Sequence, residues 1–308
     1  MGKPTRASFG EALVELGEKN KKIVALDADL SRSVKTAAFA EKFPERFFEI
    51  GIAESNMVGV AAGLALSGFI PFCASFAAFV AGRFETIRMS VAYCQANVKI
   101  VGTHCGLGIG EDGNSQMGLE DLSIMRSLPG MVVIQPVDHV ETKQAVAFAV
   151  QHQGPVYLRL TRQDVEDVNP RDYSFQFGKG VVLKKGKDIV LFATGALVYH
   201  TLEAALSLEK EGINAEVINI HTLKPIDNDL VIQKAKEFKR IMTLEDHNII
   251  GGLGSAVAEV LSENEPVKIK RIGVMDVFGE SGSPDELYQK YGFDKEGIMK
   301  SIKAFMKS

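Results

Sequence analysis

Short apolar segments alternate with amphipathic segments along the first half of the chain. An apolar stripe at Phe9, Leu13 and Leu16 predicts a first helix, and Ser8 followed by Glu11 predicts a capping box at its start. Because strands and helices alternate without hairpin signals, we expect a mostly parallel sheet with helices on both faces. The predicted strands are residues 22–26, a segment ending at Gly51, 69–75, 98–103, 132–136 and 156–160, and the predicted helices are 8–19, one beginning at Glu54, 84–93 and 141–150.

An acidic segment containing glycine and proline, residues 164–187, interrupts this alternation, and we interpret it as the connection between two domains. Two domains suit a length of 308 residues, because single cores stop growing near about 250–300 residues. We therefore expect an α/β protein with two three-layer αβα domains and mostly parallel sheets, residues 1–187 including the connection and residues 188–308. The second domain is predicted to hold strands 188–193, 215–219, 240–244 and 268–273 and helices 198–209, 228–237 and 254–262.

The composition is ordinary for a soluble globular protein, with 46% apolar residues, 24% charged residues and a formal net charge of −4. This charge balance gives no sign of binding to nucleic acid or to a membrane surface. The uncharged segment from Ser55 to Gly82 is long enough for a membrane span, but Gly68 and Pro71 break it. There is no apolar signal-peptide core at the N-terminus, and three cysteines are typical of a reducing compartment. We expect a cytoplasmic protein.

Glu54 opens the apolar, small-residue helix, and no residue between it and Arg83 carries a formal charge. Burial disfavours the ionised form of a carboxyl group, so Glu54 is predicted to hold or share a proton near neutral pH. An acidic residue in the first turn of a helix is also favoured by the helix dipole. Its placement alone therefore leaves a functional and a structural interpretation open.

Polar side chains follow several predicted strands at the points where those strands end. Because the carboxyl ends of parallel strands meet at one edge of a sheet, we expect these residues to share a ligand site there. Each of them taken singly is explained as a capping or loop residue, so the hypothesis rests on their convergence. The residues concerned are Asp29 to Ser33, Glu54, His104 to Gln116, and Arg162.

Three further groups have two interpretations each. Phe76 and Phe79 form either part of the core or a surface on which a flat heterocycle stacks. The glycine-rich segment 251–255 is either an anion site or a tightly packed helix start. Residues 245–247, Glu-Asp-His, end a strand of the second domain and are either structural or located at a subunit contact.

Three motifs in order resemble those of transketolase: Gly51 to Glu54, Phe76 to Phe79, and Thr103 to Gly113. The resemblance extends from Thr5 to Phe293, and the chain looks like the C-terminal half of transketolase encoded as a separate subunit. It implies a thiamine-diphosphate enzyme of the pentose phosphate pathway that reversibly transfers a two-carbon ketol unit from a ketose phosphate to an aldose phosphate. Residues 1–187 then correspond to the pyrimidine-binding domain and residues 188–308 to the C-terminal transketolase domain.

The same resemblance implies roles for individual residues. Glu54 is similar to the glutamate that hydrogen-bonds N1′ of the aminopyrimidine, and Phe76 and Phe79 to aromatic residues that stack on that ring. A phosphate clamp from arginines suits the permanent charge and planar fork of guanidinium groups. The implied catalytic residues are Glu54, His104 and Asp112, the cofactor contacts are Glu54, Phe76, Phe79, Leu30 and Ile52, and the substrate contacts are Arg6, Ser33, His104, Asp112, Arg162 and Gln116.

Two positions depart from the family pattern, because Gln116 stands where a histidine is usual and Gly82 where a tyrosine is usual. We also find no Gly-Asp-Gly motif with a downstream asparagine pair, the Mg²⁺-diphosphate site of this cofactor class. We therefore predict no metal ligands in this chain and a partner subunit, the N-terminal half of transketolase, that holds the diphosphate and the metal. Exposed apolar faces are expected to drive self-association to a dimer.

Alternative functions share the same expected architecture. One is the β subunit of a 2-oxo-acid dehydrogenase, against which the phosphate-binding set Arg6, Ser33 and Arg162 argues. A second is a fragment related to 1-deoxyxylulose-5-phosphate synthase, and a third is a regulatory or scaffold subunit without catalysis. The presence of Glu54 and Asp112 argues against the third.

Overall fold

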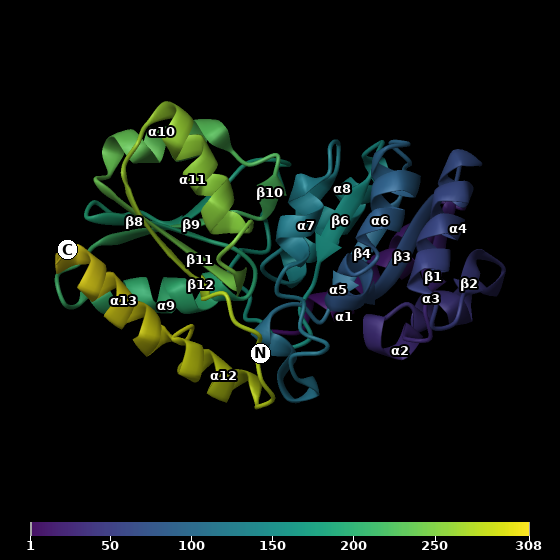
Figure 1. Cartoon of the computed structure of the whole chain (residues 1–308), viewed down its shortest axis with the longest axis horizontal. Coiled ribbons are helices and arrows are strands. Elements are labelled where there is room, and N and C mark those ends of the chain that lie inside the picture. The colour runs from purple at the N-terminus through teal and green to yellow at the C-terminus, as the bar shows by residue number, and fades with distance from the viewer. Residues whose placement is uncertain (1, 308) are drawn as a thin grey trace.

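The computed structural model describes residues 2–307, which form two α/β domains side by side (Figure 1). The first domain is built on a seven-stranded sheet of order β10-β5-β6-β4-β3-β1-β2. Every neighbouring pair in this sheet is parallel except β10 and β5. Its strands are β1 (Ile23–Asp27), β2 (Phe47–Glu49), β3 (Ile70–Phe76), β4 (Lys99–Thr103), β5 (Val132–Ile134), β6 (Val156–Arg159) and β10 (Thr222–Lys224).

Helices cover both faces of this sheet. In β1, Ile23 and Ala25 belong to the core shared with α1 and α8, whereas Val24 and Leu26 point into the core shared with α4 and α7, as the two-residue period of a strand requires. The helices are α1 (Thr5–Lys19), α2 (Ser31–Val34), α3 (Ala37–Lys42), η1 (Pro44–Arg46), α4 (Glu54–Leu66), α5 (Ala77–Ala81), α6 (Phe84–Thr86), the π-helix η2 (Ile87–Ala92), the 3₁₀ segment η3 (Leu107–Asp112), α7 (Asp121–Ser127) and α8 (His139–Gln151).

The second domain has a five-stranded sheet of order β12-β11-β8-β9-β7, in which only the edge strand β7 is antiparallel to its neighbour. Side chains of α9, α12 and α13 pack in one core, and those of α10 and α11 pack in another. The elements are β7 (Val181–Lys184), β8 (Ile189–Ala193), α9 (Leu197–Glu209), β9 (Ala215–Asn219), α10 (Asn228–Glu237), β11 (Arg240–Asn248), α11 (Leu253–Asn264), β12 (Lys268–Val274), α12 (Pro284–Tyr291) and α13 (Lys295–Lys307). The prediction of two αβα domains with mostly parallel sheets is confirmed.

Some local predictions are wrong. The first helix begins at Thr5, so Ser8 does not cap it; the Ser8 hydroxyl is buried in the helix and lies 2.9 Å from Nδ1 of His139. Residues 181–184, assigned to the connection, form β7 and pair with β9. The uncharged segment after Glu54 is α4, β3 and α5 in succession, and no helix within residues 2–307 has both the length and the apolar character needed to cross a bilayer.

Candidate functional site

The parallel strands of the first sheet direct their carboxyl ends to one edge, where the predicted site residues follow them. Thr5 and Thr161 join two of these regions, because the Thr161 backbone amide donates to Oγ1 of Thr5 at 2.8 Å. This contact holds the first turn of α1 against the end of β6. It therefore brings Arg6 and Arg162 to the same part of the edge.

Arg6, Ser33 and His104 form one connected group. Nη1 of Arg6 donates to the Ser33 carbonyl at 2.8 Å and lies 2.9 Å from Nε2 of His104. Burial and the nearby Arg162 lower the pKa of Arg6, whereas Asp112 opposes that shift. Nε of Arg6 is buried and has no protein partner, so a donor remains free at this edge.

His104 is neutral and its tautomer is fixed by its neighbours. Burial, followed by the charges of Arg6, Arg162 and Lys35, lowers the pKa of His104 to about 3. Because Arg6 can only donate, Nε2 of the neutral ring accepts and Nδ1 carries the proton, which it donates to Oγ1 of Thr103 at 2.8 Å. His104 also has a positive φ of 57°, a conformation that costs free energy for a residue with a side chain.

Phe76 and Phe79 lie where β3 ends and α5 begins. Their rings are stacked, with centroids 5.2 Å apart, and the ring of Phe76 also stacks on His104 at 3.7 Å. Phe76 is buried, and Phe79 is half-buried. The predicted aromatic group is thus in contact with the predicted anion-binding group.

Glu54 begins α4 and is buried, with 5% of its surface exposed. Although no charged residue lies between Glu54 and Arg83 in the sequence, the two side chains pair in the fold, with Nη2 of Arg83 3.6 Å from Oε2 of Glu54. Arg83 is the next charged residue along the chain and immediately precedes α6, which lies beside α4 in the fold. Glu54 is therefore a buried carboxylate paired with a partly exposed guanidinium.

The glycine-rich loop after β4 carries the remaining acidic residues. Nη1 of Arg162 donates to the Ile109 carbonyl at 2.6 Å and pairs with Glu111 at 3.1 Å. Asp112 is exposed at the end of η3. Arg162 is consequently held by this loop.

The other predicted site residues lie outside the group of contacts around Arg6 and His104. Leu30 and Ser33 line a cavity of about 230 Å³ at the end of β1, whereas Gln116 is half-buried and its side chain makes no hydrogen bond within residues 2–307. Ile52 is 83% exposed, and Gly82 is exposed where α5 ends. A larger cavity of about 710 Å³ lies between α1 and the α2–α3 segment, and Arg32 is the one member of the predicted site that lines it.

Comparison with known proteins identifies both domains. Residues 2–167 match the family of the transketolase pyrimidine-binding domain, and residues 178–298 match that of the transketolase C-terminal domain. The chain belongs to the transketolase family. Within it, the chain is 50% identical to a Methanocaldococcus jannaschii protein named for the transketolase C-terminal section, over 99% of this chain and 97% of that protein.

Two other relatives show the range of the transketolase family. A 6-deoxy-6-sulfo-D-fructose transketolase subunit from Clostridium sp. is 42% identical over 96% of this chain and 92% of its own length. Mouse transketolase is 39% identical over 98% of this chain, which spans 49% of the mouse protein. A solved structure described as a split gene transketolase, an inactive beta4 tetramer, superposes with a TM-score of 0.91 at 47% identity, over 100% of this chain and 99% of that one.

The transketolase family is thiamine-diphosphate-dependent, and some groups at this edge fit part of that cofactor. A buried carboxylate at Glu54 suits a ring nitrogen that shares a proton, and the Phe76–Phe79 stack suits a flat ring. Within residues 2–307, no group of three or more His, Cys, Asp or Glu side chains lies close enough to hold a metal ion.

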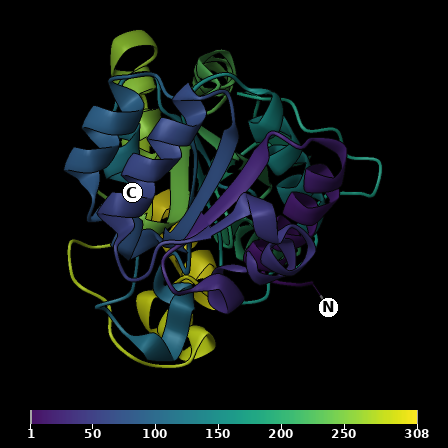
Figure 2. The ribbon, with the colours of Figure 1, turned by 90° about the vertical axis from the view of Figure 1, so that its right-hand side faces the viewer.

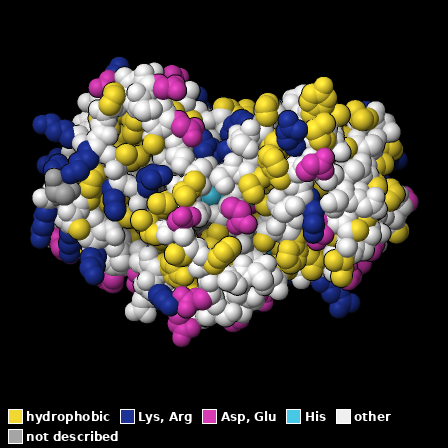
Figure 3. All heavy atoms as spheres, in the orientation of Figure 1, with side chains coloured by type: hydrophobic (Ala, Val, Ile, Leu, Met, Phe, Trp, Pro, Cys, Tyr) yellow, Lys and Arg dark blue, Asp and Glu magenta, His cyan; other side chains and the backbone are white. Residues whose placement is uncertain are grey.

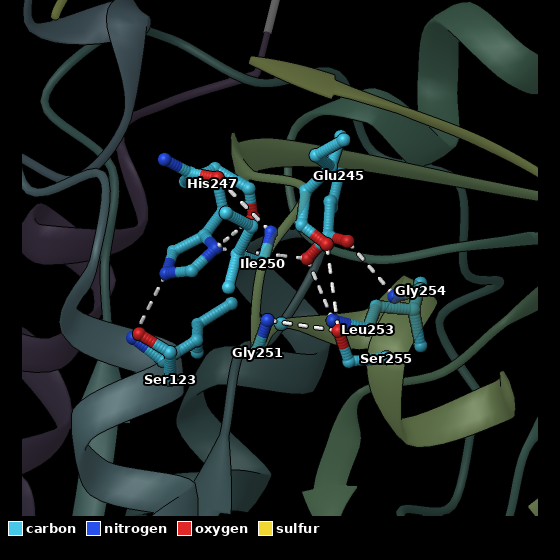
Figure 4. A network of polar contacts seen from close by, with 12 residues as sticks. Ser123, Glu245, His247, Ile250, Gly251, Leu253, Gly254 and Ser255 are labelled. Carbon is cyan, nitrogen blue, oxygen red and sulfur yellow. Dashed lines mark hydrogen bonds and ion pairs between the residues drawn. The ribbon is translucent and has the colours of Figure 1, made fainter. Parts of the chain in front are cut away.

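Glu245 and His247 of the Glu-Asp-His segment in β11 make contacts within this chain. Oε1 and Oε2 of Glu245 accept from the backbone amides of Gly254 and Leu253 at 2.8 and 2.6 Å, so the protein's own carboxylate occupies the N-terminus of α11 (Figure 4). This contact favours the helix-start interpretation of residues 251–255 over an anion site. His247 accepts at Nε2 from the backbone of Leu122 at 3.2 Å and so joins the two domains.

Glu245 is expected to make stability depend on pH. Burial raises its pKa to about 7, against the two backbone hydrogen bonds that lower it. Since the unfolded group titrates near about 4.3, its contribution is fully present below that pH and is lost as the pH rises through about 7. Relative to Glu245→Gln, the wild-type chain should lose about 1–3 kcal/mol of unfolding free energy between pH 5 and pH 8. Urea unfolding of both proteins at pH 5 and pH 8 measures this loss. The same difference in unfolding free energy between the two proteins at both pH values would contradict the prediction.

Proposed function

We propose that this chain is the C-terminal subunit of a split transketolase and transfers a two-carbon ketol unit between sugar phosphates with thiamine diphosphate. The observation that carries the proposal is the joint presence at one sheet edge of a buried carboxylate, an aromatic stack and an arginine–histidine group with a free buried donor. Thiamine diphosphate, when bound, supplies the nucleophile and electron sink for the carbon–carbon chemistry.

The chain's own residues then have distinct tasks. Glu54 holds the proton that the pyrimidine ring shares, and Phe76 and Phe79 orient that ring. Arg6 and Arg162 bind the terminal anion of the sugar, with neutral His104 fixing the position of Arg6. Asp112 accepts a hydrogen bond from a sugar hydroxyl, and its exposure leaves it open to the substrate.

A partner subunit resembling the N-terminal half of transketolase is proposed to hold Mg²⁺ and the diphosphate. Support comes from the relatives that are named as separate sections or subunits, and from the solved assembly of one such chain type, which is described as inactive. Apolar side chains are exposed over the face formed by α4 and η2, including Leu66 and Tyr93, 70% and 80% exposed (Figure 3). We propose that the partner or a second copy covers this face.

Reconstitution tests the proposal. The chain is co-expressed with the candidate N-terminal subunit and supplied with thiamine diphosphate, Mg²⁺, a ketose phosphate and an aldose phosphate. Two-carbon transfer by the mixture, and by neither chain alone, is the expected result. Pyruvate decarboxylation with an artificial electron acceptor in place of ketol transfer would overturn the proposal in favour of a 2-oxo-acid dehydrogenase subunit.

The proposed contact between Arg162 and the terminal phosphate of the sugar predicts how a substitution of Arg162 changes KM. Replacing Arg162 with glutamine removes a charged donor from the sugar's terminal anion, so KM for phosphorylated sugars should rise about 10–100-fold with a smaller change in kcat. Steady-state kinetics of the reconstituted assembly measures both constants. Because a relative is named for a sulfonated sugar, a sulfonated ketose is assayed alongside. An unphosphorylated ketose serves as the control, and a KM that rises equally for it contradicts the assignment.

A further inference from the structure

The glycine-rich loop that carries Asp112 is bound at its start by the second domain. One carboxylate oxygen of Asp246 in β11 accepts from the backbone amide of Leu107 at 2.8 Å, and the other accepts from that of Gly108 at 3.2 Å. Asp246 is 2% exposed. These bonds join residues 139 and 138 positions apart in the chain.

The loop packs on this carboxylate without room for side chains. A Cβ atom on Gly106 would overlap the carboxylate of Asp246, and the positive φ of 74° at Gly106 also disfavours other residues. A Cβ on Gly108 would overlap the Gln163 side chain. The two glycines therefore allow a close approach that a longer side chain at either position would prevent.

A short chain of hydrogen bonds extends this contact to the end of β6. The Tyr288 hydroxyl of α12 donates to Oδ2 of Asp246 at 2.8 Å and accepts from Nε2 of Gln163 at 2.9 Å. Gln163 follows Arg162 directly, and Arg162 donates to the Ile109 carbonyl in the same loop. Figure 2, like Figure 1, shows α12 (yellow) beside the loop that follows β4. Arg162 and the loop carbonyl that it contacts are therefore both next to residues held by the second domain: Gln163 by Tyr288, and the start of the loop by Asp246.

We propose that Asp246, with Tyr288, is a positioning residue that fixes the loop of residues 106–113 and the Arg162 guanidinium for substrate binding. This assigns to the second domain a role in binding sugar, in addition to its own packing. The inference rests on the proposed function for its kinetic consequence, but the ordering of the loop by Asp246 does not depend on any activity.

The neighbouring residue provides a matched control. Glu245 is as buried as Asp246 and also accepts two backbone N–H bonds, but its partners Leu253 and Gly254 lie in its own domain. Asp246→Asn and Glu245→Gln each replace one buried carboxyl group by an amide with almost no change in volume. Only the first leaves an amide NH₂ facing a loop N–H that needs an acceptor.

Amide hydrogen exchange followed by mass spectrometry measures loop order in the full chain, and steady-state kinetics follows in the reconstituted assembly. For Asp246→Asn we expect exchange of the peptide covering residues 106–113 to accelerate at least about tenfold. We also expect KM for the sugar phosphate to rise about tenfold while kcat changes less than about threefold. Glu245→Gln should leave loop exchange and KM within about twofold of wild type.

Each outcome decides the inference. Faster loop exchange and a higher KM in Asp246→Asn alone support it, whereas equal effects in both variants, or an unaltered loop in a folded Asp246→Asn chain, overturn it. If Asp246→Asn fails to fold, Tyr288→Phe replaces it, and unaltered loop exchange in that variant overturns the inference. Absence of two-carbon transfer by the wild-type assembly would overturn the proposed function, and loop exchange would still decide the role of Asp246.

Discussion

Replacing Glu54 with glutamine is expected to lower kcat of the reconstituted assembly by about 10²–10⁴-fold. Glutamine keeps the volume and a hydrogen-bonding oxygen, but it cannot hold or release the proton that the pyrimidine nitrogen shares. The fold should survive, because the lost ion pair is with Arg83, whose side chain is 44% exposed. Initial rates at saturating sugar phosphate measure the effect, and circular dichroism confirms that the variant is folded.

The control for this prediction is Glu85→Gln, which removes an exposed acid from α6, close in sequence to Arg83. It should keep kcat within about twofold of the wild-type value. Turnover by Glu54→Gln close to that of wild type would remove the basis of the proposed catalytic role. A loss of equal size in Glu85→Gln would instead indicate an effect of net charge in this region.

The largest loss of stability is expected from Asp121→Ala. Asp121 and Arg159 are fully buried and form two hydrogen bonds, from Nε at 2.8 Å and from Nη2 at 3.1 Å, and the Tyr157 hydroxyl donates to the same carboxylate at 2.7 Å. Removing the carboxylate leaves a buried guanidinium without its counter-charge, which typically costs about 3–5 kcal/mol. Urea unfolding monitored by circular dichroism measures this loss.

Glu259→Ala serves as the matched surface change. Glu259 pairs with Arg126 at 2.7 Å, but its side chain is 64% exposed, so its loss should cost only about 0–1 kcal/mol.

The stabilisation by Asp121 also depends on pH. Burial alone would raise the pKa of Asp121, but Arg159 holds it below its ordinary value, so this stabilisation is present above the unfolded pKa and lost as the pH falls below it. A change of under 1 kcal/mol in Asp121→Ala would contradict the prediction.

The position of the candidate site could be predicted from the sequence, because parallel strands place their carboxyl ends together at one edge of the sheet. His104 and Arg162 were expected there for this reason, and the structure joins His104 to Arg6 and to Phe76. The pairing of Glu54 with Arg83 was not predictable in the same way. It depends on the packing of α6 beside α4, which sequence spacing does not encode.

Contacts between the domains were also missed. Strands β7 and β10 have four and three residues, too few for a clear alternating pattern, so neither was recognised. The Asp246 contacts depend on the docking of one sheet against a loop of the other domain. The sequence identified Asp246 as a polar strand end but could not indicate its partner.

Strand β10 couples the stability of the two domains. The chain leaves the second sheet after β9, pairs antiparallel with β5 through Thr222 and Lys224, and then returns to form α10. A fragment cut at the domain boundary would expose the edge of β5, an unpaired edge of the kind that promotes aggregation. We therefore expect the subunit to melt in one cooperative transition, and its first domain to be unobtainable as a well-behaved isolated fragment.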